Sequence, residues 1–203
     1  MKNAIRLLLL LAITFIASIT NAQVYDGITQ PTKYRIWVPT STSLNDYNTT
    51  VSPFFGYRQD IYDWFSITPV VQYNINKESF IPQIWLNFNV KQKFYVLSRS
   101  IYDTKANVYK HTLSATYKFP LGFMIDTTWE NLYNGHEFCE TDRLQFLIGY
   151  AYKWFVLNAG YSCLNSPGIV SNLRLKVTEY NWLQLKYDGG TESIQIGCAL
   201  QFN

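Results

Sequence analysis

Residues 65–90 read FSITPVVQYNINKESFIPQIWLNFNV, and this stretch decides the fold. Up to position 75 its odd-numbered residues are apolar, while most of the residues between them are small and polar. After the polar link 76–78, the even-numbered residues from Phe80 to Val90 are apolar. A period of two is the pattern of a β-strand with one apolar face. The stretch therefore predicts two long strands joined by a short link.

The same alternation continues along the chain and predicts an all-β domain of twelve strands. These strands are expected at 34–43, 50–59, 64–75, 79–90, 94–102, 108–119, 123–133, 143–152, 155–163, 169–178, 182–188 and 193–202. Tight links alternate with looser ones rich in Asn, Asp and Gly, the longest being 134–142. Four prolines in the first four strands remove ladder donors and predict bends or bulges there. They are Pro39, Pro53, Pro69 and Pro82.

Two architectures explain such alternation: a secreted β-sandwich with its apolar face inward, and a membrane barrel with that face outward. Most predicted strands have about 9–11 residues, the length that crosses a bilayer when tilted. Tyr and Phe gather near the strand ends, and the opposite face is small and polar rather than heavily charged. An antiparallel transmembrane β-barrel is therefore favoured, with twelve strands. Barrels of eight or ten strands with taller hairpins are alternatives.

The first residues have the layout of a cleaved signal peptide. Lys2 and Arg6 precede an apolar run from Leu7 to Ala17, and small residues lead to a cleavage point after Ala22. The run is short for a membrane anchor, which is the alternative. We expect a signal peptide at 1–22 and a barrel domain at 23–203. Removing Lys2 and Arg6 lowers the formal charge from +3 to +1.

These features together resemble the outer-membrane β-barrel proteins of Gram-negative bacteria. The resemblance rests on the signal-peptide end Ile19–Ala22, the alternation over the whole mature chain, and the aromatic-bearing last strand from Ile194 to Phe202. The chain departs from the family pattern in that Asn203 follows the terminal aromatic residue. The resemblance implies an outer-membrane location, lipid around the barrel, and barrel-assembly machinery as a partner during biogenesis.

Composition excludes several classes of protein. Aromatic residues make up 17% and charged residues 15% of the chain, which excludes a disordered protein and argues against nucleic-acid binding. Only one apolar run approaches 20 residues, so a helical membrane bundle is excluded. The two histidines, His111 and His136, and the three cysteines, Cys139, Cys163 and Cys198, lack catalytic or metal-ligand spacing. We therefore expect no catalytic site, metal or cofactor.

Inward-facing positions collect an excess of basic side chains. The residues assigned to the lumen are the basic Lys33, Arg35, Arg58, Lys110, Lys118, Arg174, Lys176 and Lys186, and the acidic Asp126, Glu130 and Asp188. Folding about 120–122 places Lys118 diagonal to Asp126 and Lys110 diagonal to Glu130, which predicts neutralised pairs. The aromatic Trp37, Trp85 and Trp182 also face inward and are interpreted as fillers of a narrow bore.

Folding about 179–181 places Arg174 opposite Lys186, with Lys176 diagonal. Like charges in this arrangement destabilise a sheet unless water, acids or a bound anion compensates. A hydrated wall screened by counter-ions or by Asp188 is one explanation, and an anion-selective ladder is the other. In the second case, Trp182 could stack a sugar ring beside the cations. The candidate lumenal binding residues are Arg174, Lys176, Lys186, Trp182, Trp85 and Arg35.

The resulting hypothesis is a narrow, monomeric outer-membrane channel for small polar or anionic solutes such as acidic sugars. One alternative is a non-conducting barrel with a structural or partner-binding role. A barrel hydrolase acting on lipid is a further alternative with less support, because no activated Ser–His arrangement is found.

Overall fold

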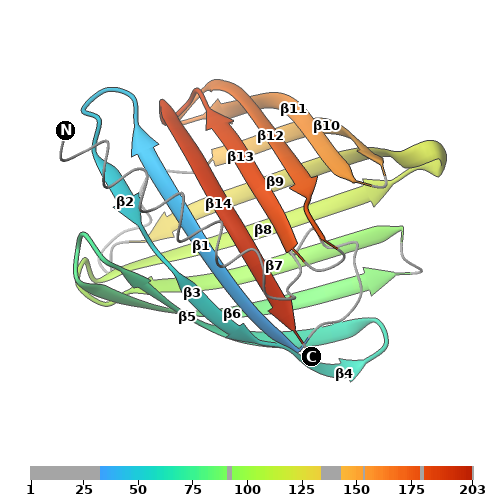
Figure 1. Ribbon diagram of the computed structural model, residues 1–203, viewed down its shortest axis with the longest axis horizontal. Helices are drawn as coiled ribbons and strands as arrows, with labels where there is room; N and C mark the ends of the chain where they lie inside the picture. The colour runs from blue at the N-terminus through green and yellow to red at the C-terminus, as the bar shows by residue number, and fades with distance from the viewer. Residues whose placement is uncertain (1–32, 91–92, 134–142, 153, 179–180, 203) are drawn as a thin grey trace.

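The computed structural model describes residues 33–90, 93–133, 143–152, 154–178 and 181–202 (Figure 1). Its strands and one 3-10 turn are β1 (Tyr34–Ser43), β2 (Thr49–Val51), β3 (Phe54–Tyr57), β4 (Gln59–Tyr62), β5 (Phe65–Asn74), β6 (Ser79–Val90), β7 (Phe94–Asp103), β8 (Val108–Lys118), η1 (Pro120–Gly122), β9 (Phe123–Tyr133), β10 (Arg143–Tyr152), β11 (Phe155–Leu164), β12 (Gly168–Lys176), β13 (Asn181–Asp188) and β14 (Ser193–Phe202). The predicted signal peptide, His136 and Cys139 lie outside the described residues. Within them, no helix has the length and apolar character needed to cross a membrane.

The strands form one closed antiparallel barrel, as the ring of arrows in Figure 1 shows. Closure is made by β14 and β1, which pair from Tyr34–Phe202 to Ser43–Ser193. The segments β2, β3 and β4 together fill the single position between β1 and β5. The fourteen strands therefore occupy twelve positions, which confirms the predicted twelve-stranded barrel.

The second predicted strand, 50–59, is wrong as a continuous element. Pro53 lies between β2 and β3, and the register with β5 shifts between Asp60 and Tyr62. At Pro69 and Pro82, β5 and β6 pair with each other in register through both residues. On the opposite sides the ladders are interrupted: the pairing of β5 with β3 and β4 skips Pro69, and the pairing of β6 with β7 begins at Gln83. Each proline lacks one ladder donor, and each lies where one of the two neighbouring ladders is interrupted.

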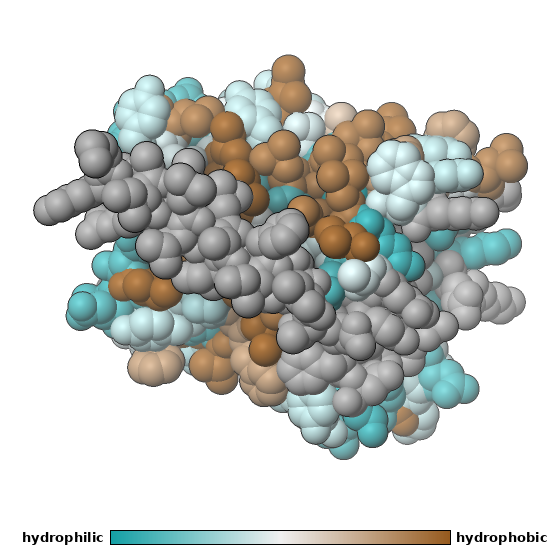
Figure 2. Space-filling view, in the orientation of Figure 1, coloured by the Kyte–Doolittle hydropathy of each residue, from teal (hydrophilic) through white to brown (hydrophobic). Residues whose placement is uncertain are grey.

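The outer surface is apolar, as expected for a wall that faces hydrocarbon. Large hydrophobic side chains such as Phe80, Ile84, Ile148 and Ile169 are more than half exposed. Figure 2 shows such side chains gathered over the strands at the top of the view. The inner wall is polar: Thr68, Thr112 and Ser162 are fully buried inside the barrel. A soluble sandwich has the opposite arrangement, so this alternative is wrong.

Aromatic pairs mark the end of the barrel that carries the short turns. Tyr62 stacks on Trp64 with ring centroids 5.5 Å apart, and Phe65 stacks on Phe88 at 4.8 Å. Similar contacts join Tyr117 to Phe119, Phe123 to Tyr150 and Trp154 to Phe155. Such a girdle suits the membrane–water interface, where amphipathic rings are stable. The opposite end carries looser links such as 75–78 and 104–107.

Candidate functional site

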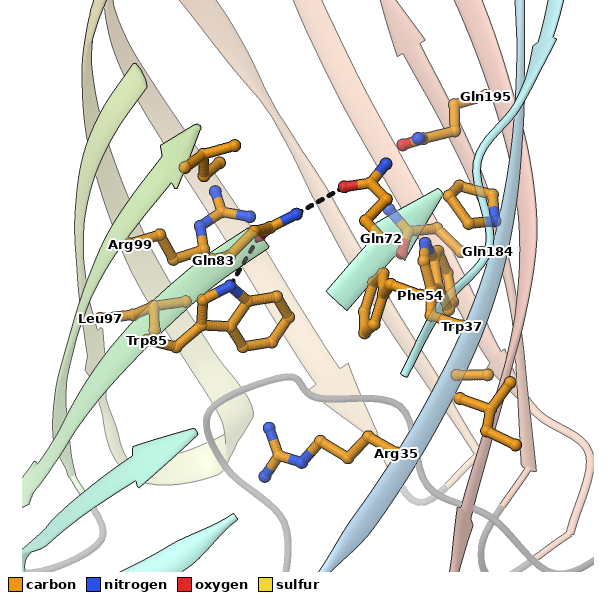
Figure 3. Close-up of a pocket in the computed structure, with 14 residues that line it drawn as sticks. Arg35, Trp37, Phe54, Gln72, Gln83, Trp85, Leu97, Arg99, Gln184 and Gln195 are labelled. Atoms are coloured by element: carbon orange, nitrogen blue, oxygen red, sulfur yellow. Dashed lines mark hydrogen bonds between the residues drawn. The ribbon is translucent and has the colours of Figure 1, made fainter. Parts of the chain in front are cut away.

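Three adjoining cavities lie in the lumen and are lined by described residues. The aromatic cavity, of about 280 Å³, is lined by residues including Arg35, Trp37, Phe54, Gln72, Gln83, Trp85 and Arg99 (Figure 3). The central cavity, of about 290 Å³, shares Arg99, Gln184 and Gln195 with it. The rim cavity, of about 210 Å³, lies beside the loop-side ends of β13 and β14 and shares Lys186 and Gln195 with the central cavity. The three cavities therefore form a continuous row along the inside of the wall.

The aromatic cavity has side chains held in fixed positions. Trp85 Nε1 donates a hydrogen bond of 2.8 Å to Gln83 Oε1, and Gln83 Nε2 donates to Gln72 Oε1 (Figure 3). Phe54 meets the Trp85 ring edge-on, with centroids 5.3 Å apart. The Arg99 guanidinium lies 5.9 Å from the centroid of the same ring, within the range of a cation–π contact. This cavity thus combines aromatic faces, amides and guanidinium groups.

The rim cavity contains a buried ion-pair network. Arg143 Nη1 donates a 2.8 Å hydrogen bond to Asp188 Oδ2, Nη2 donates to Oδ1, and Lys186 Nζ lies 3.4 Å from Oδ2. Arg143 Nε donates a 2.7 Å hydrogen bond to Ser162 Oγ. Lys110 pairs with Glu130 at 2.9 Å, which confirms that predicted diagonal pair. These contacts join β8 to β9 and β10 to β13.

Removing Arg143 should be costly, because Asp188 would keep only long contacts, with Lys186 at 3.4 Å and with Thr191 N at 3.3 Å. We expect Arg143→Met to lower the free energy of unfolding by about 3–5 kcal/mol, as for a buried charge that loses its partner. The double variant Arg143→Met/Asp188→Leu should recover most of this loss. The measurement is reversible urea unfolding of the lipid-embedded barrel, followed by Trp fluorescence.

The matched control is the more exposed pair Arg58–Asp60, joined at 2.6 Å. Arg58→Met should cost less than about 1 kcal/mol, since exposed ion pairs contribute little. An Arg143→Met loss no larger than that of Arg58→Met would contradict the structural role assigned to the buried pair.

The central cavity carries three cations and one carboxylate among the described residues. Arg99, Arg174 and Lys186 line it, and Asp126 is the carboxylate. Asp126 already accepts hydrogen bonds from Thr116 Oγ1 and Asn158 Nδ2. This cavity therefore favours an anion.

The three cavities together are lined by more cations than carboxylates within the described part of the chain. The cations are Arg35, Arg99, Lys110, Arg143, Arg174 and Lys186, and the carboxylates are Asp126, Glu130 and Asp188. Every one of these carboxylates accepts a hydrogen bond or forms an ion pair with the protein. A low-dielectric wall focuses the field of such an excess into the bore.

An apolar layer lies toward the short-turn end of the lumen. Met124, Val156, Trp182 and Ala199 are at most 4% exposed and form one cluster, against which Trp37 and Ala151 pack. Met124 and Val156 line the central cavity, whereas Trp37 and Ala199 line the aromatic cavity. The layer thus borders both cavities and spans from β9 to β1.

Two lumen-facing glycines make room for this layer. A Cβ atom at Gly197 would lie 2.6 Å from Trp37 Cζ2, and one at Gly149 would lie 2.8 Å from Met124 Cγ. A side chain at Gly197 would displace Trp37, and one at Gly149 would displace Asn158, whose Oδ1 is still closer, and Met124. The apolar layer is therefore packed like a small barrel interior, where large and small residues alternate.

The structure distributes the six predicted site residues over different places. Arg35 and Trp85 line the aromatic cavity, and Arg174 and Lys186 line the central cavity. Trp182 belongs to the apolar layer. Lys176 pairs in register with Trp182 but lines none of the three cavities.

The predicted register of β12 and β13 is wrong by two residues. Arg174 lies opposite Gln184, and Lys186 lies opposite Asn172, so the two cations do not face each other. The turn is placed differently because Asn181 O accepts a 2.8 Å hydrogen bond from Val177 N. A shift of two residues keeps every side chain on its predicted face, which is why the inward assignment still holds.

Other parts of the lumenal assignment need correction. Lys118 is diagonal to Asp126 as predicted, and Asp126 accepts hydrogen bonds from Thr116 and Asn158. Lys33 is exposed, and Arg58 pairs with Asp60 rather than lining a cavity.

Sequence reasoning missed two lumenal cations. Arg143 lies two positions before Gln145, which the alternation assigns to the lumen. The same alternation therefore indicates that Arg143 also faces inward. Arg99 lies on β7, where Tyr95, Leu97 and Ile101 face the lumen and blur the alternation. The contacts that β7 makes across the bore could not be read from its sequence.

The described residues offer little for catalysis or metal binding. Ser98 and Ser100 are hydrogen-bond partners of His111, and Trp129 packs edge-on against its ring. No group of three His, Cys, Asp or Glu side chains in the described ranges could hold a metal ion. Cys163 and Cys198 are free thiols.

Similar architectures occur among solved structures. The KdgM porin superposes with a TM-score of 0.57 over 83% of this chain and 99% of its own length, at 11% identity. The Omp33 outer membrane protein of Acinetobacter baumannii gives 0.55 over 84% of this chain and 98% of its own, at 9% identity. This is the outer-membrane β-barrel fold. The NanC porin aligns with the barrel at a TM-score of 0.53 and 7% identity, over 83% of this chain and all of its own. No family model and no curated protein sequence matches the chain.

Proposed function

We propose that this barrel is a narrow outer-membrane channel that prefers small anionic or polar solutes, including acidic sugars. The observation that carries the proposal is the excess of cations over carboxylates along the three cavities. Charged groups lining a narrow pore set its ion preference. Since the lumenal carboxylates already have partners in the protein, the excess positive charge acts on whatever enters the bore.

The lining also supports the choice of solute. Amides and hydroxyls such as Gln83, Gln145, Asn158 and Thr128 accompany the cations in the two larger cavities. These groups suit the hydroxyls of a sugar, and Arg99, Arg174 and Lys186 suit its acid group. One structure of similar fold is described as a KdgM porin in complex with disordered oligogalacturonate. That likeness concerns the fold, at 11% identity, so the solute stays a proposal for this chain.

A non-conducting barrel is the second candidate, and the apolar layer favours it. Trp182 and Met124 are almost fully buried between the two larger cavities and the short-turn end. Dry apolar constrictions oppose the passage of hydrated ions. In this case the barrel would have a structural or partner-binding role.

The proposed location and maturation follow from the same hypothesis. Residues 1–22 would direct export and be removed, and residues 23–203 would insert in the outer membrane with the help of barrel-assembly machinery. The outer surface would contact lipid, and the barrel would act as a monomer.

A planar-bilayer recording separates the channel from the closed barrel. We expect the folded protein to give discrete single-channel currents in KCl. The control is the same preparation after heat denaturation, which should give none. Correctly folded protein that inserts without producing current would favour the closed barrel and contradict the channel.

A further inference from the structure

We propose that the central cavity is a binding site for a small carboxylate that also carries hydroxyl groups, and that it recognises both features. This inference rests on the proposed function because the solute must enter the lumen. It adds that binding requires the hydroxyls of the solute and is not an effect of charge alone.

Four side chains that line this cavity each carry a buried polar atom that has no hydrogen-bond partner among the described residues. Two are donors, Gln145 Nε2 and Arg174 Nε, and two are acceptors, Asn158 Oδ1 and Asn172 Oδ1. A buried polar atom without a partner destabilises the fold, so such atoms are rare unless water or a ligand satisfies them. Because four such side chains line one cavity, we infer that this cavity binds a polar ligand.

The strand register places acceptor and cation side by side. Asn158 lies directly opposite Asn172, and Asn172 lies directly opposite Lys186, so the three form one level across β11, β12 and β13. Arg174 occupies the next inward position on β12 and pairs with Gln184, which also lines the cavity. A carboxylate held by Arg174 and Lys186 would bring its neighbouring carbon atoms toward the amides.

The mixture of donors and acceptors points to hydroxyl groups. A hydroxyl donates one hydrogen bond and accepts others, so it can satisfy Asn158 Oδ1 and Gln145 Nε2 alike. A carboxylate without hydroxyls offers only acceptors and would leave Asn158 Oδ1 and Asn172 Oδ1 without partners. Asp126 already accepts two hydrogen bonds from the protein and does not replace these acceptors. Sites built to bond a hydroxyl discriminate strongly against analogues that lack it.

The test compares three ring compounds by calorimetric titration of the folded barrel in detergent. The compounds are glucuronate, cyclohexanecarboxylate, which lacks the hydroxyls, and glucose, which lacks the charge. We expect glucuronate to bind at least about tenfold more tightly than either of the other two. Equal affinity for glucuronate and cyclohexanecarboxylate, or no glucuronate binding, would overturn the proposal.

Two leucine variants locate the site. Asn172→Leu should weaken glucuronate binding about tenfold and leave cyclohexanecarboxylate binding unchanged. The matched control is Asn87→Leu, since Asn87 is also a buried lumen-facing asparagine but lines none of the three cavities. An Asn87→Leu loss equal to that of Asn172→Leu would also overturn the proposal. Circular dichroism of both variants must match the parent spectrum.

Failure of this site and failure of the channel give different results. A barrel that conducts in KCl but binds the two carboxylates equally would support the proposed channel and contradict the proposed binding site. A barrel that binds glucuronate selectively but carries no current would support the proposed binding site and contradict the proposed channel.

Discussion

Replacing Arg99, Arg174 and Lys186 together with Gln should abolish the anion preference of the channel. These residues are the three cations of the central cavity, and their removal leaves three cations and three carboxylates along the described lumen. The fixed charges would then balance. We expect the chloride-to-potassium permeability ratio, measured from reversal potentials in a KCl gradient, to fall from well above one to near one.

The matched control removes three charges from the surface instead. Lys77, Lys93 and Lys105 are exposed and line none of the three cavities. Their replacement with Gln changes the net charge by the same amount, but exposed charges are screened by salt over about 10 Å. The ratio should therefore change little. Equal effects of the two triple variants would show that the central cavity does not set selectivity.

Truncating two large side chains of the apolar layer should raise single-channel conductance several-fold. In the double variant Trp182→Ala/Met124→Ala, two large side chains that lie across the short-turn end of the lumen are removed. The lumen at this end becomes wider and easier to hydrate, which lowers the free-energy barrier for ion passage. Core truncations of this size cost about 2–5 kcal/mol each, so folding must be verified by heat-modifiable electrophoretic mobility before recording.

The outer face of β9 provides the control for this variant. Ile125 and Trp129 point away from the lumen, as the register of β9 with β10 requires. Ile125→Ala/Trp129→Ala should leave single-channel conductance unchanged. If the Trp182/Met124 variant conducts no better than the parent, whether or not the parent conducts, the layer is not the constriction.

Alternation predicted the strands well because a barrel wall has chemically different faces on each side. Most predicted bounds differ from the observed ones by no more than two residues, and the faces of Arg35, Trp85, Arg174 and Lys186 are correct. Face assignment depends only on parity, so it survives a register shift of two residues. The pairing of Arg174 with Lys186 depended on the turn and was therefore wrong.

The contacts that build the site could not be read from the sequence. Arg143 and Asp188 are 45 residues apart, and β11 and β12 lie between their strands, but the closed wall lets their inward-facing side chains meet. Trp182 packs with Met124 for the same reason, although both residues have inward parity. Parity shows that a side chain faces the lumen, but the shape of the closed barrel decides which side chains it meets there.

The most direct test of the central claim is the reversal potential of the unmodified barrel in a planar bilayer under a tenfold KCl gradient. A lumen with excess positive charge predicts a value close to the Nernst potential of chloride. A value close to the Nernst potential of potassium would contradict the account, as would the absence of any current from protein shown to be folded and inserted.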